Sequence, residues 1–383
     1  MKRLVLVLTA LALLLGMVPV GAKAAPLEVA GKSTLLMDVA TGKVLYENNA
    51  HEALAPASVT KVMTMLLIME AIDSVRIGWD DMVTTSEAAA AKGGSQVFLK
   101  VGERMKVSDM VKSIAVSSAN DCACAMAEHI AGSESAFVDQ MNARAKELGM
   151  NDTHFVNCTG LDDSPEAQSH KTSAYDIALM SRELMKNHPD IKKYTTIWMD
   201  TVRAGAFGLS NTNKLVRFYQ GATGLKTGFT SGAGYCRSAS AERDGMELIA
   251  VVMGCETSKE RFAACKSMLD YGFANYAVVM PQIPEAAEIP VKLGVRDTVV
   301  AVPSDATAIL IDKSQKNMIV YRTELEEAVA APVSMGQRLG TLSVMVGDQT
   351  LARIPLVAEE AVEKLTFWQV FLRVLRQFCM AKA

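Results

Sequence analysis

The amino-acid sequence predicts an α+β fold: an antiparallel sheet flanked by helices, then a small all-β sandwich domain and a C-terminal amphipathic helix. Three observations support this prediction. Apolar residues recur at helical spacing through much of 58–185, and from Leu225 the spacing becomes that of strands. A break at Pro281-Gln282-Ile283-Pro284 precedes short strand-like runs that lack helical periodicity. Residues 363–378 return to a helical pattern.

The first domain begins with a predicted hairpin, in which residues 32–39 and 43–46 are strands joined by Ala40-Thr41-Gly42. Helices follow at 58–72, in two segments within 107–130, at 135–148 and at 172–185. Consecutive strands are then predicted at 225–230, 234–241 and 247–255, with a closing helix at 258–275. We therefore expect both ends of this domain to meet in one antiparallel sheet.

Four segments follow from these patterns: a signal peptide at 1–24, an α+β domain at 25–281, an all-β domain at 282–358 and an amphipathic helix at 359–383. The all-β assignment depends on six short strand-like runs with turns between them, a pattern typical of a sandwich. These runs are 289–293, 298–302, 308–311, 318–322, 338–346 and 350–356.

The N-terminus has the order of a secretory signal peptide. Met1-Lys2-Arg3 is cationic, an apolar run extends from Leu4 to Val20, and Ala22-Lys23-Ala24 offers small residues for cleavage after Ala24. The alternative is an uncleaved membrane anchor, because the apolar run is near the lower limit for crossing a bilayer. Both interpretations predict a protein that works outside the cytoplasm.

The composition excludes several functional classes. The formal net charge of the 383 residues is −3, and sparse basic stretches argue against nucleic-acid binding. Seven cysteines at irregular spacing do not form a small disulfide framework, and whether Cys236 and Cys255 pair is left open. Cys122-x-Cys124 has no second ligand pair at zinc spacing. We therefore expect neither a metal nor an organic cofactor.

The C-terminal segment is amphipathic on a helical projection. Its apolar side includes Phe367, Trp368, Phe371 and Phe378, and its polar side carries arginines. Such a helix is too short and too polar to span a bilayer but is suited to lying in the membrane interface. The alternative is a terminal helix docked on the all-β domain. Aromatic density and the arginines favour association with the outer face of the cytoplasmic membrane.

Three short motifs contain the candidate chemistry. In Ser58-Val59-Thr60-Lys61, a helix starting near Ser58 places the Lys61 amine beside the Ser58 hydroxyl. A serine is a weak nucleophile and needs such a base, which lysine can be when burial lowers its pKa. Taken alone, this pattern also fits a capping serine and a solvated lysine.

The other two motifs supply polar groups for a substrate. Ser118-Ala119-Asn120 falls at a break between helices, where a hydroxyl can relay a proton and an amide can hold a peptide group; local capping is the alternative. Lys226-Thr227-Gly228 lies in the first of the later strands. Its lysine and hydroxyl can bind a carboxylate, and its glycine lets an extended substrate approach the backbone. An ordinary edge strand is the alternative.

The three motifs in this order resemble the set found in penicillin-binding proteins and β-lactamases, with Ser-Ala-Asn in place of Ser-Asp-Asn. The chain is similar to low-molecular-mass penicillin-binding proteins, the D-alanyl-D-alanine carboxypeptidases of peptidase family S11. The resemblance covers about residues 30–275, and the all-β domain and tail fit the family's layout by pattern. Further matching segments are 56–64, 94–103, 141–150, 155–161, 170–176 and 211–213.

The resemblance implies a role for each motif residue. Ser58 would be the acylated nucleophile and Lys61 its base, and Ser118 would pass the proton to departing D-alanine. Asn120 would hold the substrate amide. Lys226 and Thr227, with Gly228 beside them, would bind the terminal carboxylate. Backbone N–H groups of Ser58 and Phe229 would form the oxyanion hole.

Two positions depart from the family pattern. Phe229 follows the Lys-Thr-Gly motif where some relatives have histidine, so a carboxylate contact from that side chain is missing. Cys158 stands where proline is common, which we expect to affect loop stiffness and not chemistry. His129, His154 and His170 are interpreted as structural, since no Ser-His-Asp order is evident.

The resemblance implies peptidoglycan stem peptides as substrates and β-lactam antibiotics as acylating inhibitors. Two alternatives remain. A secreted β-lactamase would share the same residues, but a convincing Glu-x-x-Asn element for fast deacylation is missing. A catalytically silent protein that binds wall peptides would not need five intact motif side chains, namely Ser58, Lys61, Ser118, Asn120 and Lys226.

Overall fold

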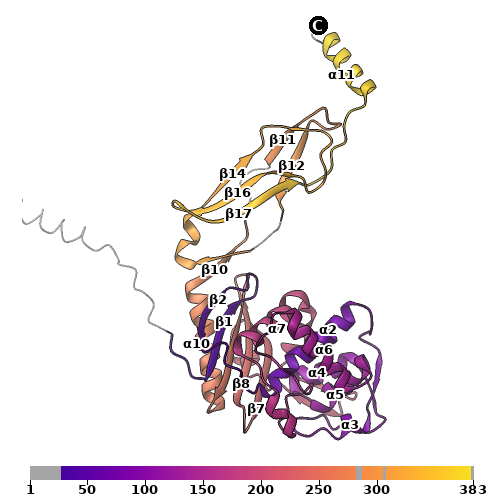
Figure 1. Cartoon of the computed structure of the whole chain (residues 1–383), viewed down its shortest axis with the longest axis vertical. Coiled ribbons are helices and arrows are strands. Elements are labelled where there is room, and N and C mark those ends of the chain that lie inside the picture. The colour runs from indigo at the N-terminus through magenta and orange to yellow at the C-terminus, as the bar shows by residue number, and fades with distance from the viewer. Residues whose placement is uncertain (1–26, 282–286, 305–307, 381–383) are drawn as a thin grey trace, which may run out of the picture.

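The computed structural model describes residues 27–281, 287–304 and 308–380, with the side chains of 377–380 left out (Figure 1). The expected signal peptide at 1–24 lies outside these residues. A domain of helices and a sheet is followed by a smaller β domain, in agreement with the predicted fold class, and the chain continues into a terminal helix.

The sheet of the first domain contains five antiparallel strands in the order β2-β1-β9-β8-β7. The first strand of the chain, β1, pairs with β9, with Leu35 opposite Val251. The two ends of the domain therefore meet in one sheet, as expected. The strands are β1 (Ser33–Asp38), β2 (Val44–Asn48), β7 (Ala222–Thr230), β8 (Gly234–Arg243) and β9 (Met246–Cys255).

Helices cover both faces of this sheet (Figure 1). Because strand side chains alternate between faces, Leu35 and Met37 enter the core beneath α2 and α7, whereas Leu36 enters the core beneath α10. All residues of α2 from Lys61 to Met69 are buried, so this helix runs through the centre of the helical layer. The helices are η1 (Ala57–Thr60), α2 (Lys61–Asp73), α3 (Glu87–Ala90), α4 (Val107–Ser117), α5 (Asn120–Ala131), α6 (Glu134–Glu147), η2 (Pro165–Ser169), α7 (Ala174–Asn187), η3 (Pro189–Ile191), α8 (Lys192–Thr195), α9 (Leu215–Phe218) and α10 (Ser258–Asn275).

Two small two-stranded sheets were not anticipated from the sequence. They pair β3 (Met82–Thr84) with β4 (Arg104–Lys106) and β5 (Met199–Val202) with β6 (Phe207–Ser210). Strands this short carry too few residues for an alternating pattern to be recognised.

The β domain has its own apolar core, which includes Leu342, Val344, Ile354 and Leu356. Its main sheet has the order β14-β16-β17-β12-β11-β15, and β10 pairs separately with β13. Since β10 directly follows α10, this pairing joins the two domains by backbone hydrogen bonds. The elements are β10 (Tyr276–Val279), β11 (Ala287–Lys292), β12 (Thr298–Pro303), β13 (Ile309–Asp312), η4 (Lys313–Met318), β14 (Ile319–Leu325), β15 (Val329–Ala330), β16 (Arg338–Val346) and β17 (Gln349–Ala358).

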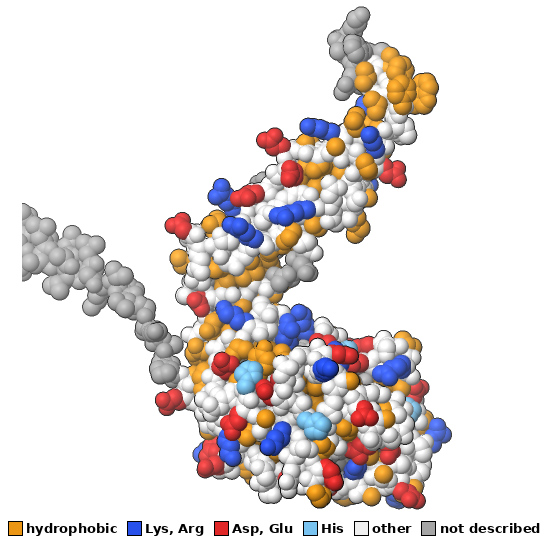
Figure 2. Space-filling view, in the orientation of Figure 1, with side chains coloured by type: hydrophobic (Ala, Val, Ile, Leu, Met, Phe, Trp, Pro, Cys, Tyr) orange, Lys and Arg blue, Asp and Glu red, His pale blue; other side chains and the backbone are white. Residues whose placement is uncertain are grey.

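The terminal helix α11 (Phe367–Met380) extends beyond the β domain (Figure 1). It contacts that domain through Arg373, which pairs with Asp297, while hydrophobic side chains gather on its surface (Figure 2). Phe367 and Trp368 are 75% and 69% exposed. Among the helices of the described residues, every one is too short or too polar to cross a membrane.

Candidate active site

The first two candidate residues lie at the junction of η1 and α2. The i, i+3 spacing places both side chains on one face, and Lys61 Nζ donates a hydrogen bond to Ser58 Oγ at 3.0 Å. The same amine donates to the carbonyl of Thr159 at 2.8 Å. Lys61 is completely buried, so these contacts hold a lysine amine against a serine hydroxyl inside the protein.

Burial makes Lys61 a suitable base. Loss of solvation lowers its pKa from 10.5 to about 7, against the opposing influence of Cys158 and Asp121. A second buried lysine, Lys226, also has a strongly lowered pKa because of burial and the positive charges of Lys61 and Arg261. Near neutral pH, a large share of the Lys61 amines therefore carry a free lone pair.

The second motif lies where α4 ends and α5 begins. Ser118 adopts the left-handed conformation with φ of 64°. This conformation ends α4, so Ser118 lies in the turn between the two helices. Asn120 Nδ2 donates to the carbonyl of Gly93 at 2.7 Å. Ser118 Oγ and Asn120 Oδ1 are buried without a hydrogen-bond partner among the described residues. Buried polar atoms of this kind destabilise the protein unless water or a ligand satisfies them.

The third motif lies on β7 directly against the turn that contains Ser58. A Cβ on Gly228 would lie 2.7 Å from the carbonyl oxygen of Pro56 and 3.0 Å from Ser58 N. The sequence analysis assigned this glycine to substrate approach, and the structure adds that the close contact with the Ser58 turn also requires a residue without a Cβ. Lys226 Nζ donates to the Thr227 carbonyl at 2.8 Å, and Thr227 Oγ1 donates to Thr212 Oγ1 at 2.7 Å.

The loop at 94–99 is fixed beside the second motif. Asn120 N donates to the Ser95 carbonyl at 2.7 Å, and the Asp121 carboxylate accepts from Val97 N and Leu99 N. The side chain of Phe98 between them is 66% exposed. The loop therefore borders the Ser118–Asn120 turn.

Phe229 continues β7 beyond the Lys-Thr-Gly motif. Its side chain is 53% exposed and its ring lies 4.3 Å from that of Tyr235 on β8. The residue after the motif therefore packs its ring against Tyr235. The expected oxyanion role of the Phe229 backbone N–H stays a prediction.

Arg261 on α10 was missed in the sequence. Its guanidinium donates to the carbonyls of Gly228 at 2.9 Å and Cys236 at 3.2 Å, and its Nε has no partner among the described residues. Arg261 is 7% exposed and places a second positive charge beside Lys226. A single arginine in an amphipathic helix gives no signal in sequence, because its burial depends on the sheet behind it.

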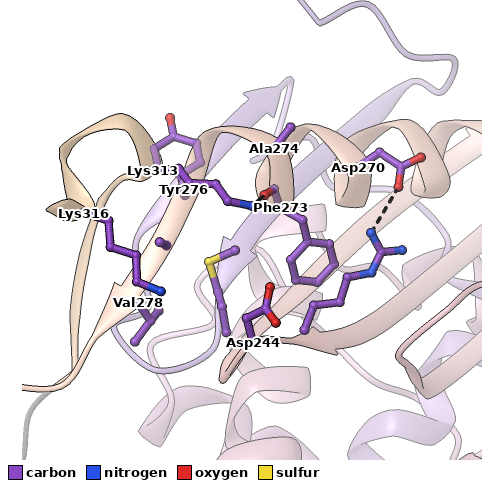
Figure 3. Close-up of a pocket in the computed structure, with 11 residues that line it drawn as sticks. Asp244, Asp270, Phe273, Ala274, Tyr276, Val278, Lys313 and Lys316 are labelled. Carbon is purple, nitrogen blue, oxygen red and sulfur yellow. Dashed lines mark hydrogen bonds and ion pairs between the residues drawn. The ribbon is translucent and has the colours of Figure 1, made fainter.

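A separate cavity of about 330 Å³ lies where the first domain meets η4 (Figure 3). It is lined by residues that include Asp244, Phe273, Tyr276, Lys313 and Lys316, and it contains none of the motif residues. Lys313 Nζ donates to the carbonyl of Phe273, which ties η4 to α10. This cavity is therefore distinct from the candidate active site.

One group of metal-ligand type occurs among the described residues, formed by Glu70, Glu183 and His188. Arg144 pairs with both carboxylates at 2.7 Å, so a protein cation already neutralises part of their charge. The six cysteines with described side chains are free thiols, which answers the open question of Cys236 and Cys255 in this structure.

Comparisons with known proteins match both domains of the chain. Residues 20–257 match the family model for D-alanyl-D-alanine carboxypeptidase, Peptidase_S11, and residues 282–364 match that for the penicillin-binding protein 5 C-terminal domain. The carboxypeptidase DacF of Bacillus subtilis is 43% identical over 353 residues, which cover 91% of this chain and 90% of that protein. DacC of Escherichia coli is 34% identical, covering 89% and 86%.

Solved structures show the same likeness. Penicillin-binding protein 5 of Haemophilus influenzae aligns with a TM-score of 0.75 and 30% identity, covering 89% of this chain and 99% of that one. Penicillin-binding protein D2 of Listeria monocytogenes, solved in its ampicillin-bound form, aligns with a TM-score of 0.59 and 32% identity. That alignment covers 65% of this chain and 100% of the Listeria chain.

Proposed function

Because this chain belongs to the peptidase S11 family of serine D-alanyl-D-alanine carboxypeptidases, we propose that Ser58 is the residue acylated in its reaction. The chain is a penicillin-binding D-Ala-D-Ala carboxypeptidase, and neither a β-lactamase nor a silent binding protein is favoured. The observation that supports the assignment of Ser58 is its 3.0 Å contact with a buried lysine whose pKa is about 7.

The proposed reaction removes the terminal D-alanine of a stem pentapeptide in two steps. Ser58 Oγ attacks the carbonyl carbon of the penultimate D-alanine while Lys61 Nζ accepts the hydroxyl proton. The peptide C–N bond then breaks, and Ser118 relays this proton from Lys61 to the departing amine, so that Lys61 and Ser118 both regain their starting protonation states. Water attacks the acyl-enzyme ester in the second step and releases the shortened peptide, which restores the Ser58 hydroxyl.

The other motif residues bind the substrate in this proposal. The unpartnered Asn120 Oδ1 accepts a hydrogen bond from a substrate amide. Lys226 and Thr227 provide hydrogen-bond donors for the terminal carboxylate, and Arg261, which donates to the Gly228 carbonyl of β7, provides positive charge beside them. The backbone N–H groups of Ser58 and Phe229 stabilise the oxyanion. A β-lactam, which carries a comparable amide and carboxylate, is expected to acylate the same serine.

We further propose that the protein acts on peptidoglycan outside the cytoplasm. The N-terminal segment 1–24 would direct export, and the exposed apolar side chains of α11 would rest on the outer face of the cytoplasmic membrane. In this arrangement, the catalytic domain at 25–281 and the β domain at 282–358 stand above the membrane, and the helix within 359–383 lies in its interface.

Intact-protein mass after incubation with a fluorescent penicillin tests the assignment of Ser58. We expect one stable adduct on the mature chain and none on Ser58→Ala, with D-alanine release from a pentapeptide lost in parallel. Rapid loss of the antibiotic without an adduct would indicate a β-lactamase. An intact antibiotic and no adduct would indicate a silent binding protein, and an adduct that persists in Ser58→Ala would refute the assignment.

A further inference from the structure

A buried histidine outside the three motifs lies directly behind the turn that contains Ser58. His170 is 3% exposed and belongs to the segment that returns towards α7. Both of its ring nitrogens are within hydrogen-bond distance of protein groups: Nδ1 lies 3.1 Å from Val156 N, and Nε2 lies 2.8 Å from Thr60 Oγ1. The ring therefore connects two segments that are far apart in the chain.

The direction of each hydrogen bond follows from its partners. A backbone N–H can only donate, so Val156 donates to His170 Nδ1, and the proton of the neutral ring must be on Nε2. Nε2–H therefore donates to Thr60 Oγ1, whose own proton is donated to the carbonyl of Ala57 at 2.8 Å. Burial lowers the His170 pKa to about 4, which keeps the ring neutral in this tautomer.

One end of this chain of hydrogen bonds fixes the residue before the nucleophile. Ala57 has φ of 49°, a left-handed conformation that is unfavourable for alanine and persists only where its surroundings enforce it. Its carbonyl accepts the Thr60 hydroxyl and packs against Gly160, where a Cβ would lie 1.9 Å from the Ala57 oxygen. The orientation of Ser58 depends on this turn.

The other end fixes the loop that holds the base. Val156 begins the segment that leads to Thr159, whose carbonyl accepts the Lys61 amine at 2.8 Å. The carbonyl of Cys158 in the same segment accepts Thr64 Oγ1 at 2.6 Å, which ties the loop to α2. His170 is therefore the side chain that links the loop at 156–160 to Thr60, in the turn between Ser58 and Lys61.

We propose that His170 is a positioning residue for acylation, which holds the Ser58 turn and the loop contacting Lys61 in one fixed relation. This proposal rests on the roles proposed above for Ser58 and Lys61. His170 exchanges no proton with the substrate. It acts through Thr60 and Val156, whose hydrogen bonds satisfy both of its nitrogens at once.

The test measures acylation by a fluorescent penicillin at substrate concentrations that separate binding from the chemical step. We expect His170→Leu and Thr60→Val each to slow the chemical step about tenfold. The double variant should be no slower than the slower single variant, because either change breaks the same chain. His170→Gln, which retains a donor towards Thr60, should recover part of the rate. His154→Leu is the matched control, since His154 is exposed and we expect it to leave the rate unchanged.

A pH profile separates positioning from a general loss of stability. If the loop at 156–160 relaxes in His170→Leu, water reaches Lys61. The desolvation that lowers the Lys61 pKa then decreases, and the pKa rises. The acid limb of the acylation rate should then move to higher pH. Thermal unfolding shows whether His170→Leu folds poorly. If it does, Thr60→Val provides the same measurement, because valine has nearly the shape of threonine.

Three results would overturn the proposal while the wild-type chain still forms its Ser58 adduct. They are a folded His170→Leu variant with the wild-type rate and pH profile, rate losses that multiply in the double variant, and no recovery of rate in His170→Gln. Failure of the wild-type chain to form any adduct would instead contradict the proposed function itself.

Discussion

Replacing Gly228 with alanine should separate the turn that contains Ser58 from β7 and slow acylation strongly. The added Cβ would lie 2.7 Å from the Pro56 carbonyl oxygen and 3.0 Å from both Ser58 N and Val59 N. Ordinary contacts of these kinds are about 3.4 Å or longer, so backbone atoms must separate by roughly half an ångström. All three clashing atoms belong to the main chain, which cannot rotate away as a flexible side chain would.

The size of the effect follows from which atoms move. Ser58 N lies on one side of the separation and the backbone of Gly228 and Phe229 on the other, and these segments carry the two proposed oxyanion donors. Losing one such donor typically costs about 10²–10³ in rate. A displacement of about half an ångström should cost less, and we expect the chemical step to slow about 30- to 100-fold. Overpacking should also lower the free energy of unfolding by about 1–3 kcal/mol.

Stopped-flow acylation with a fluorescent penicillin measures the rate, and chemical denaturation measures stability. Gly208→Ala is the matched control, because a Cβ there meets nothing within 4 Å and we expect little change in either quantity. A Gly228→Ala variant that acylates at the wild-type rate would refute the reasoning. A variant with wild-type stability but slow acylation would show that the turn yields without loss of packing.

Two further predictions concern Lys61 and α11. Since the base must be unprotonated and its pKa is about 7, the acylation rate should rise about tenfold per pH unit below 7 and level off above it. Lys61→Arg, which stays protonated, should acylate below detection, and a flat profile between pH 5 and 8 would exclude Lys61 as the base. Replacing exposed Trp368 and Phe371 with serine should weaken sedimentation with anionic phospholipid vesicles at least tenfold and leave pentapeptide cleavage unchanged. Equal sedimentation would contradict a membrane role for α11.

Local patterns explain why much of the fold was predictable. The change from helical to alternating spacing near Leu225 marked the later strands, and β7, β8 and β9 lie where that alternation was recognised. The pairing of β1 with β9 also followed, since an N-terminal hairpin needs neighbouring strands to bury its apolar face. The two-stranded sheets β3–β4 and β5–β6 were missed because strands of three or four residues contain too little periodicity.

The sequence by itself determined the proximity of Ser58 and Lys61, because three residues in a helical turn bring two side chains together whatever surrounds them. It also determined the order of the three motifs, from which the family resemblance followed. Tertiary structure decided everything that depends on segments distant in the chain. The Thr159 carbonyl beside Lys61, the Arg261 guanidinium behind β7 and the His170 ring behind Thr60 are all of this kind. The lowered pKa of Lys61 is the clearest case, since it results from desolvation, and burial is a property of the packed chain and not of the residue.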